Sequence, residues 1–253
     1  MLRLLSKTLI IGLLLLVTAC TANRPLPSPY YSLPVSTAAT QDESLSWWAY
    51  RFRINWPEQL EQPDFAVDLM LAHGVIKPVL EEHAGEILWW RFHRRAARSA
   101  PGHQFSFIFY CDAGTAQKII NEIEQSGLLS SAINSNIIEK TVLPASDAGS
   151  KPALNAFSDP SWSPEIQQAW PSYIMGVSAF WLALIDELHL QYQGAESDNS
   201  REVNDAQLQL EYYRELDEAI AEIWQQEGQH ALLHHLSAVF GYKPMLLKKN
   251  IVY

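Results

Sequence analysis

The sequence predicts an α+β fold, in which a sheet unit of strand, helix, strand, strand, helix and strand precedes two long antiparallel helices. Three observations support this prediction. Residues 46–56 alternate between large apolar and other side chains, residues 86–111 contain two strand-like runs about a turn, and residues 164–240 carry apolar residues at helical spacing. A period of two is typical of strands and a period of about 3.6 of amphipathic helices.

The first strand begins near Ser46. Its large apolar side chains share one face: Trp48, Tyr50, Phe52, Ile54 and Trp56. Residues 64–82 follow with apolar residues at helical spacing. Gly74 and Pro78 interrupt this pattern, so we expect one or two short helices there.

The middle of the sheet unit is a predicted hairpin. Residues 86–94 and 103–111 form its strands, with a Pro-Gly turn between them. Asp112 then opens a helix that Gly127 closes, and residues 137–143 form a fourth strand. The resulting unit, residues 47–143, resembles the split β-α-β-β-α-β order of ferredoxin-like folds.

A polar, proline-rich loop over residues 144–163 separates the sheet unit from a helical part, residues 164–253. Ser163 is a favourable N-cap for the first long helix. The second long helix is expected from about residue 201 to 240, either continuous or divided at Gly228. We expect the two helices to pack as an antiparallel pair on the same domain as the sheet.

The N-terminus has the pattern of an export signal. Arg3 and Lys7 precede an apolar run over residues 8–17, which is shorter than the roughly 20 residues of a membrane span. The run ends in Val17-Thr-Ala-Cys20, which resembles the lipobox of bacterial lipoproteins. The resemblance implies that the Cys20 thiol receives a diacylglycerol and that the chain is cleaved before it. An ordinary secretory signal with a chance cysteine is the alternative.

The lipobox divides the N-terminal region into a signal, residues 1–19, and a lipidated tether, residues 20–46. Four prolines between residues 25 and 34 keep the tether extended. One acyl chain holds a protein only weakly, whereas the two or three of a lipoprotein anchor it stably. In this family the residue after the cysteine directs sorting, and Thr21 in place of Asp implies the outer membrane, facing the periplasm.

Composition indicates a folded, acidic protein. The chain is 48% hydrophobic and contains nine tryptophans, which argues against disorder. Without the two basic residues of the signal, 16 Lys and Arg face 28 Asp and Glu, a formal charge of −12. Such a surface disfavours phosphate backbones, so we expect no nucleic-acid partner.

The second cysteine, Cys111, has no partner within the chain if Cys20 is lipidated. It lies in an apolar strand-like run, so we expect a buried, inert thiol. A nucleophilic thiol would need a positive and accessible setting, which the surrounding sequence does not provide.

A basic cluster surrounds the predicted hairpin. Its candidate ligand-binding residues are Arg91, Arg94, Arg95 and His103. Arginine forks match carboxylate and phosphate groups, so the cluster is a candidate anion site. The alternative is a solvated hairpin end that pairs with local acids.

Two tryptophan doublets, Trp47-Trp48 and Trp89-Trp90, occur on predicted strands. Successive side chains point to opposite faces of a sheet, so each doublet places one ring on each face. Core packing and an exposed aromatic binding platform are both compatible with this pattern.

A candidate metal site lies in the last helix. Glu227, His230 and His234 are spaced by three and four residues, which places them on one face of a continuous helix. Zinc or another divalent metal is the ion that such ligands would bind. The alternative is a solvated helix face with no cofactor.

Residues 89–95 and 102–109 also resemble the strand-turn-strand of the C-terminal domain of lantibiotic dehydratases, which pairs an aromatic, arginine-bearing strand with a His-led strand. Phe and Ser replace the arginines of that family's second strand, so the resemblance assigns no catalytic residue.

These observations predict a lipid-anchored envelope lipoprotein that acts as a non-catalytic binding or assembly module. Its partners would be the membrane, through the anchor, and an envelope protein or peptide. The sequence contains no P-loop and no G-x-S-x-G or H-E-x-x-H motif. A metal-dependent envelope enzyme that uses Glu227, His230 and His234 is the alternative function.

Overall fold

The computed structural model describes residues 44–98, 102–142, 151–195 and 205–244, all within one compact unit. The predicted signal, Cys20 and the tether as far as residue 43 lie outside the described residues. The first strand begins at Leu45, two residues before the expected start of the sheet unit.

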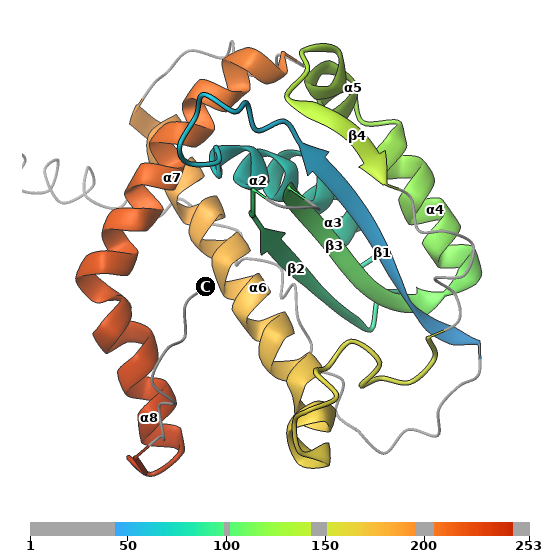
Figure 1. The fold of residues 1–253 in the computed structure, drawn as a ribbon, viewed down its shortest axis with the longest axis vertical. Helices are drawn as coiled ribbons and strands as arrows, with labels where there is room; N and C mark the ends of the chain where they lie inside the picture. Colours follow the sequence, from blue (N-terminus) through green and yellow to red (C-terminus); the bar gives the residue numbers. More distant parts are fainter. Residues whose placement is uncertain (1–43, 99–101, 143–150, 196–204, 245–253) are drawn as a thin grey trace, which may run out of the picture. The chain divides into compact units, whose positions relative to one another are not determined.

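Four antiparallel strands form one sheet in the order β2-β3-β1-β4 (Figure 1). They are β1 (Leu45–Ile54), β2 (Trp89–Arg95), β3 (His103–Asp112) and β4 (Ile138–Val142). The fold is therefore α+β, as predicted. The predicted first strand is confirmed over Leu45–Ile54, where Tyr50, Phe52 and Ile54 are at most 2% exposed. Trp56, which was expected in the same strand, lies beyond its end, and Trp47 and Ala49 on the other face are buried as well.

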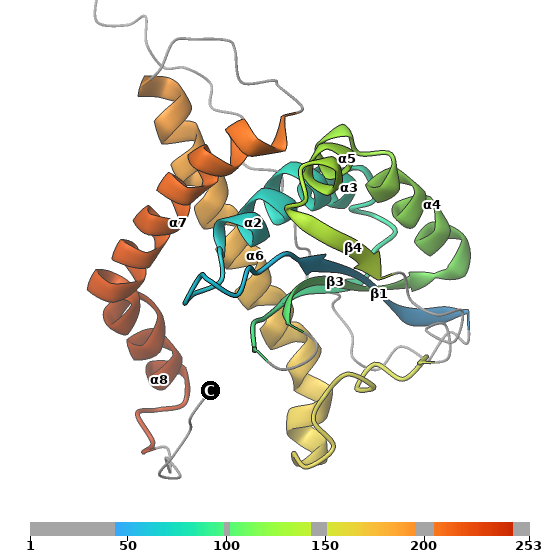
Figure 2. The ribbon, with the colours of Figure 1, turned by 45° about the horizontal axis from the view of Figure 1, so that its top comes forward.

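Helices cover one face of this sheet (Figure 2). Those between β1 and β2 are α2 (Ala66–Met70), the π-helix η1 (Leu71–Ile76) and α3 (Lys77–Glu82); those between β3 and β4 are α4 (Ala113–Glu124) and α5 (Gly127–Asn134). Aromatic side chains of the strands fill the space beneath them, among them Phe107 and Phe109, whose ring centroids are 4.8 Å apart. Burial of this apolar surface is the main source of stability.

Residues 66–82 form one helical run, and neither Gly74 nor Pro78 breaks it. Pro78 has no N–H to donate to the carbonyl of Gly74, so an α-helical bond is missing there. The chain widens into the π-helix η1 just before this point, and the amide of Lys77 bonds to Ala72 O, five residues back. The π-turn accommodates the proline without ending the helix.

The prediction that Gly127 closes the helix that begins after Asp112 is wrong. That helix, α4, ends at Glu124, and Gly127 is the first residue of a second helix, α5. The Ser126 side chain accepts a hydrogen bond from Leu129 N and so caps α5. A glycine at this position also fits a helix end, so α5 was not predicted.

The other face of the sheet is partly covered by residues 151–158. Trp47 Nε1 donates to Leu154 O at 3.0 Å, and Tyr110 Oη donates to Pro152 O at 2.7 Å. Three of the doublet tryptophans, Trp47, Trp89 and Trp90, are at most 6% exposed. The doublets are therefore core residues rather than a binding platform.

The long helix α6 (Pro164–Ala195) lies along the edge strand β2. Ser178 Oγ accepts a hydrogen bond of 3.0 Å from Phe92 N on the open side of β2. The same hydroxyl donates to Ile174 O within α6. The helix thus satisfies an amide that an edge strand would otherwise leave free.

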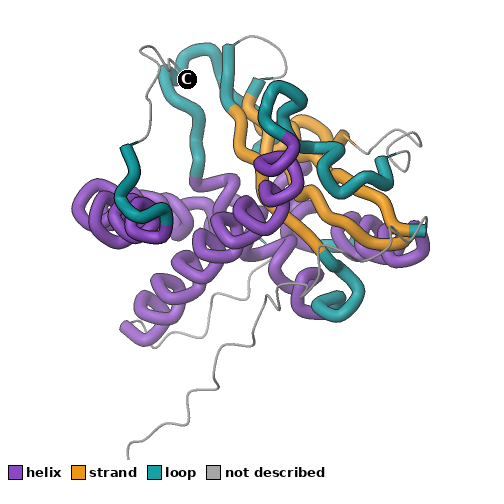
Figure 3. Tube along the Cα trace, turned by 90° about the horizontal axis from the view of Figure 1, so that it is seen from below, coloured by secondary structure: helices purple, strands orange, loops and turns teal. Residues whose placement is uncertain are grey.

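The second long helical run comprises α7 (Ala206–Gly228), the π-helix η3 (Gln229–His234) and α8 (His235–Val239). It continues through Gly228, where the helix type changes from α to π. It runs opposite to α6 and packs on α2, and Figures 1 and 3 show its far end standing apart from α6 and the strands. A polar cluster joins the elements: His73 of η1 contacts Tyr213 Oη at 2.8 Å and Asp186 of α6 at 3.0 Å.

By length and composition alone, α6 qualifies as a membrane-spanning helix over Pro164–Tyr192, with a mean hydropathy of 1.3. Core helices of soluble proteins pass the same test, and α6 packs on β2 through Ser178, Ala179 and Leu182. Only 33% of its most apolar window is buried, however. Much of its apolar surface therefore faces away from the core.

Candidate functional site

The structure separates the four candidate anion-binding residues into two pairs. Arg91 and Arg95 point to the face of the sheet opposite the helices, because they alternate with Phe92 and Arg94 along β2. Arg94 and His103 point to the helix-covered face, and His103 lies opposite Ile54 in the register. The fold therefore does not bring all four side chains together on one face of the sheet.

Arg94 and His103 share a buried carboxylate, Asp68 of α2. Arg94 Nε lies 2.7 Å from Asp68 Oδ2, and His103 Nε2 lies 3.0 Å from Asp68 Oδ1. The side chains of Asp68 and His103 are completely buried. The Arg94 guanidinium also lies 4.8 Å from the ring of Phe65 and 4.9 Å from that of Trp181. This group joins α2, β2, β3 and α6, and both carboxylate oxygens of Asp68 have a partner within it.

Asp68 was not among the predicted site residues, although its setting contained a signal. It stands within the apolar run Ala66-Val-Asp-Leu-Met70, every residue of which is buried. A carboxylate in such a run needs a charged or hydrogen-bonding partner. The arginine and histidine of the hairpin are the partners that the fold supplies.

On their face of the sheet Arg95 is exposed, whereas Arg91 lies near the segment of residues 151–158. The Arg91 guanidinium lies 6.0 Å from the ring of Phe157. Burial lowers the pKa of Arg91 from its ordinary value. Three further residues point to the same face, and we call Arg51, Arg53, Arg91, His93 and Arg95 the basic face.

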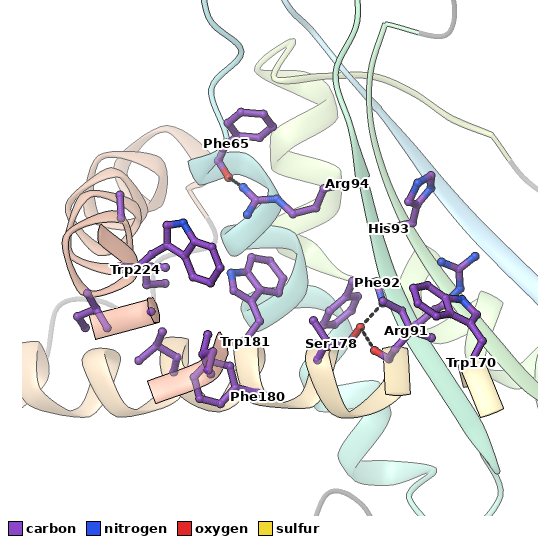
Figure 4. Close-up of a pocket in the computed structure, with 18 of the residues that line it drawn as sticks. Phe65, Arg91, Phe92, His93, Arg94, Trp170, Ser178, Phe180, Trp181 and Trp224 are labelled. Atoms are coloured by element: carbon purple, nitrogen blue, oxygen red, sulfur yellow. Dashed lines mark hydrogen bonds between the residues drawn. The ribbon is translucent and has the colours of Figure 1, made fainter. Parts of the chain in front are cut away.

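A cavity of about 1420 Å³ lies between α6 and the run α7–η3, and Figure 4 shows its lining. We call it the helix groove. Its α6 wall includes Val177 and Phe180, which are 44% and 48% exposed, and its α7 wall includes Ile220 and Trp224, of which Trp224 is 57% exposed. Large apolar side chains thus remain exposed on both walls, which is typical of a binding surface.

Charge is distributed unevenly along the helix groove. The helix α7, which forms one wall, carries six Asp and Glu residues and a single arginine. Asp217 and Glu227 line the groove itself, and burial raises the pKa of Asp217 despite the opposing effect of Arg94. At the sheet end, Arg91 and His93 reach the groove beside Trp170 (Figure 4).

The candidate metal ligands do not converge. Glu227, His230 and His234 are all exposed, and the two imidazole rings stack on each other with centroids 5.2 Å apart. The π-helix η3 begins between Glu227 and His230 and alters the spacing that a continuous α-helix would give. No group of three or more His, Cys, Asp or Glu residues in the described part of the chain is arranged to hold a metal ion.

The thiol of Cys111 is buried and free. Burial, together with the charges of Asp112 and Glu86, raises its pKa to about 12. A thiol in this state is not a nucleophile at neutral pH.

Comparison with known proteins adds no relative: no family model matches the sequence, and neither a curated protein nor a solved structure matches it. The candidate sites therefore rest on the geometry of this chain. Of the two, the helix groove is the larger and the basic face the more highly charged.

Proposed function

We propose that this chain is an outer-membrane lipoprotein, anchored through Cys20 and facing the periplasm, that acts as a non-catalytic binding module. The lipobox-like Val17-Thr-Ala-Cys20 supports the anchor. The proline-rich tether would hold the folded part away from the membrane surface.

We also propose that the sheet unit is of the ferredoxin-like type. Two features support this assignment. The strands follow the order β2-β3-β1-β4 with every neighbour antiparallel, and helical segments join β1 to β2 and β3 to β4. In this arrangement α6 and α7–α8 are additions to the unit, and the helix groove lies between those additions.

The helix groove is the docking site in this proposal, and its occupant is a basic amphipathic helix of a partner protein. The observation that supports this assignment is the exposure of large apolar side chains on both walls, Phe180 on α6 and Trp224 on α7. An amphipathic helix buries its apolar stripe in such a groove. Its basic residues would face Asp217 and Glu227, the two acids of α7 that line the groove.

The size of the groove also favours a polypeptide occupant. Small-molecule sites usually measure about 300–1,000 Å³. The helix groove, at about 1420 Å³, exceeds that range. Packed helices lie about 8–10 Å apart, so a third helix would rest on the ridges of both walls at once.

Site-specific photo-crosslinking in cells that express the full chain tests this proposal. A photoreactive phenylalanine analogue replaces Phe180 or Trp224 in the groove. Ile133 on α5, which is 41% exposed, is the matched control outside it. We expect both groove positions to crosslink to one Lys- or Arg-bearing helical segment of the same partner, and the control position not to do so.

Four results would contradict the partner-helix assignment. These are crosslinks to residues 245–253 of the same chain, crosslinks to a second copy, crosslinks to lipid, and no crosslink from either groove position. The first would show that the groove is closed internally, and the second that it is a self-association surface.

A further inference from the structure

We propose that the basic face binds a phosphate group of a phosphorylated ligand, held between Arg51 on β1 and the pair Arg91 and Arg95 on β2, above Ser106 on β3. This site is distinct from the helix groove, whose apolar walls are α6 and α7. The two share only the edge residues Arg91 and His93.

Strand register brings these side chains together. Arg51 and His93 both lie opposite Ser106, and Arg53 and Arg95 both lie opposite Gln104. Arg91 lies two residues before His93 on β2, opposite Ile108, and therefore points to the same face. Neighbouring strands are about 4.8 Å apart, so arginines from β1 and β2 flank β3 at a spacing of about 10 Å. Between them on β3 lies Ser106, a small side chain that is buried.

The arginines of this face differ from all others in the described residues. Elsewhere Arg94 pairs with Asp68, Arg214 pairs with Asp64 and Glu211, and Arg98 donates to backbone carbonyls of residues 56, 57 and 60. Among the described residues, no side-chain hydrogen bond or ion pair is made by Arg51, Arg53, Arg91 or Arg95, and Arg91 lies 6.0 Å from the ring of Phe157. The four unpaired arginines thus gather on one face.

This concentration of charge is unexpected in so acidic a chain, with a formal charge of −10. Burial lowers the pKa of His93, and the charges of Arg91, Arg95 and Arg51 lower it further. The arginines are thus close enough to repel a common neighbour. Like charges held together without a counter-ion destabilise the fold, and a bound anion removes that cost.

The number and type of donors favour phosphate over carboxylate. A phosphate monoester carries about −1.5 to −2 charges and three acceptor oxygens, whereas a carboxylate carries one charge and two oxygens. Guanidinium forks bind phosphate through paired hydrogen bonds. Arg51 on β1 and Arg91 and Arg95 on β2 flank β3 on this face, and Gln104 and Ser106 lie between them in the register.

Isothermal titration of the full chain in non-ionic detergent, with inorganic phosphate or pyrophosphate, tests this proposal. We expect saturable binding with one site per chain. Arg51→Gln and Arg91→Gln should each weaken it roughly ten- to hundredfold, the effect of losing a charge-assisted hydrogen bond. Arg98→Gln, an exposed arginine of the same hairpin that lies off this face, should bind as the wild type does.

Histidine NMR gives a second readout. Phosphate bound beside His93 should raise its pKa, because the added negative charge offsets the three arginines that lower it. Arg51→Lys keeps the positive charge but lacks the paired N–H donors of the guanidinium group. It should bind phosphate more weakly than wild type does, yet more tightly than Arg51→Gln.

Vesicle flotation of the full chain with Cys20→Ala, which lacks the proposed lipid anchor and so does not insert into vesicles by itself, separates the two sources of such a phosphate. Binding to phosphatidylcholine vesicles only when they contain phosphatidic acid, with none to inorganic phosphate or pyrophosphate, would identify a lipid headgroup. Binding to the soluble anions as well would identify the phosphate group itself. Binding to none of these, or binding that is equal in Arg51→Gln and Arg98→Gln, would overturn the proposal.

Discussion

His103 Nε2 lies 3.0 Å from Asp68 Oδ1, and both side chains are completely buried. Arg94 occupies the other oxygen of the same carboxylate at 2.7 Å. Asp68 thus pairs with side chains from two strands of the sheet. Its loss would remove the buried partner of His103 Nε2 and leave Arg94 with only the more distant carboxylate of Asp217, at 4.0 Å. The three residues are therefore a stability element rather than a ligand site.

We predict that Asp68→Asn destabilises the fold by about 3–5 kcal/mol, the usual cost of removing one partner from a buried ion pair. Asp64→Asn is the matched control, because Asp64 pairs with the exposed Arg214 and the loss should be about 0–1 kcal/mol. Urea unfolding followed by tryptophan fluorescence measures both. Equal effects for the two variants would show that the Asp68 group is not a buried network.

Ser178→Ala should remove the hydrogen bond that joins α6 to the edge strand β2 and so destabilise the fold. The substitution removes the acceptor of the Phe92 amide and leaves that buried N–H unsatisfied, at a cost of about 1–3 kcal/mol. Ser172→Ala, on the same helix, gains the same helix propensity and should be neutral or slightly stabilising. Hydrogen exchange of the Phe92 amide is the direct measurement. Unchanged protection in Ser178→Ala would mean that another acceptor serves this amide.

The sheet and its helices could be predicted because their signals are local. Alternation in β1 and the N-cap residues Asp112 and Ser163 each specify an element from a few neighbouring residues. The helix α5 was missed because a glycine after a serine fits a helix start as well as a helix end. Ser126 then decides the outcome through its hydrogen bond to Leu129 N, a contact that the sequence does not display.

The sites depended on long-range pairing and were therefore predicted only in part. Side chains along β2 alternate between the two faces of the sheet, so Arg94 points away from Arg91 and Arg95. The prediction grouped these residues because they are close in the sequence, although they are not close in space. Arg51 and Arg53 join the basic face only because β1 lies beside β3. The walls of the helix groove likewise come from segments that meet only in the folded chain.

Two helical glycines should respond oppositely to alanine. A Cβ at Gly74 would lie 2.5 Å from Leu128 Cδ2 of α5, so Gly74→Ala should destabilise the fold by about 1–3 kcal/mol through overpacking. A Cβ at Gly176 on α6 meets nothing within 4 Å, so Gly176→Ala should stabilise it by about 0.5–1 kcal/mol. Thermal unfolding compares the two. Leu128→Ala in the Gly74→Ala background should relieve the clash; if it does not, the contact is not the cause.

Cys111 should be protected in the folded protein and reactive after unfolding. Burial, with the charges of Asp112 and Glu86, raises the pKa of the folded thiol to about 12. The unfolded chain releases the proton at lower pH, so stability falls as pH rises through the alkaline range up to about 12. Alkylation by iodoacetamide at mildly alkaline pH, with and without urea, tests the prediction. Rapid alkylation without urea would instead indicate an accessible thiolate and would contradict the description of Cys111 as an inert thiol.

Cys20→Ala should release the protein from the membrane. The lipobox-like sequence implies that the Cys20 thiol carries acyl chains, and two or three chains give effectively permanent attachment. Intact mass and membrane fractionation compare wild type with the variant. We expect wild type cleaved before Cys20, heavier by its acyl groups and found with membranes, and a variant without acyl mass. If both behave as soluble exported proteins, the lipid anchor and the outer-membrane location are wrong, while the helix groove and the basic face remain to be tested on the folded domain.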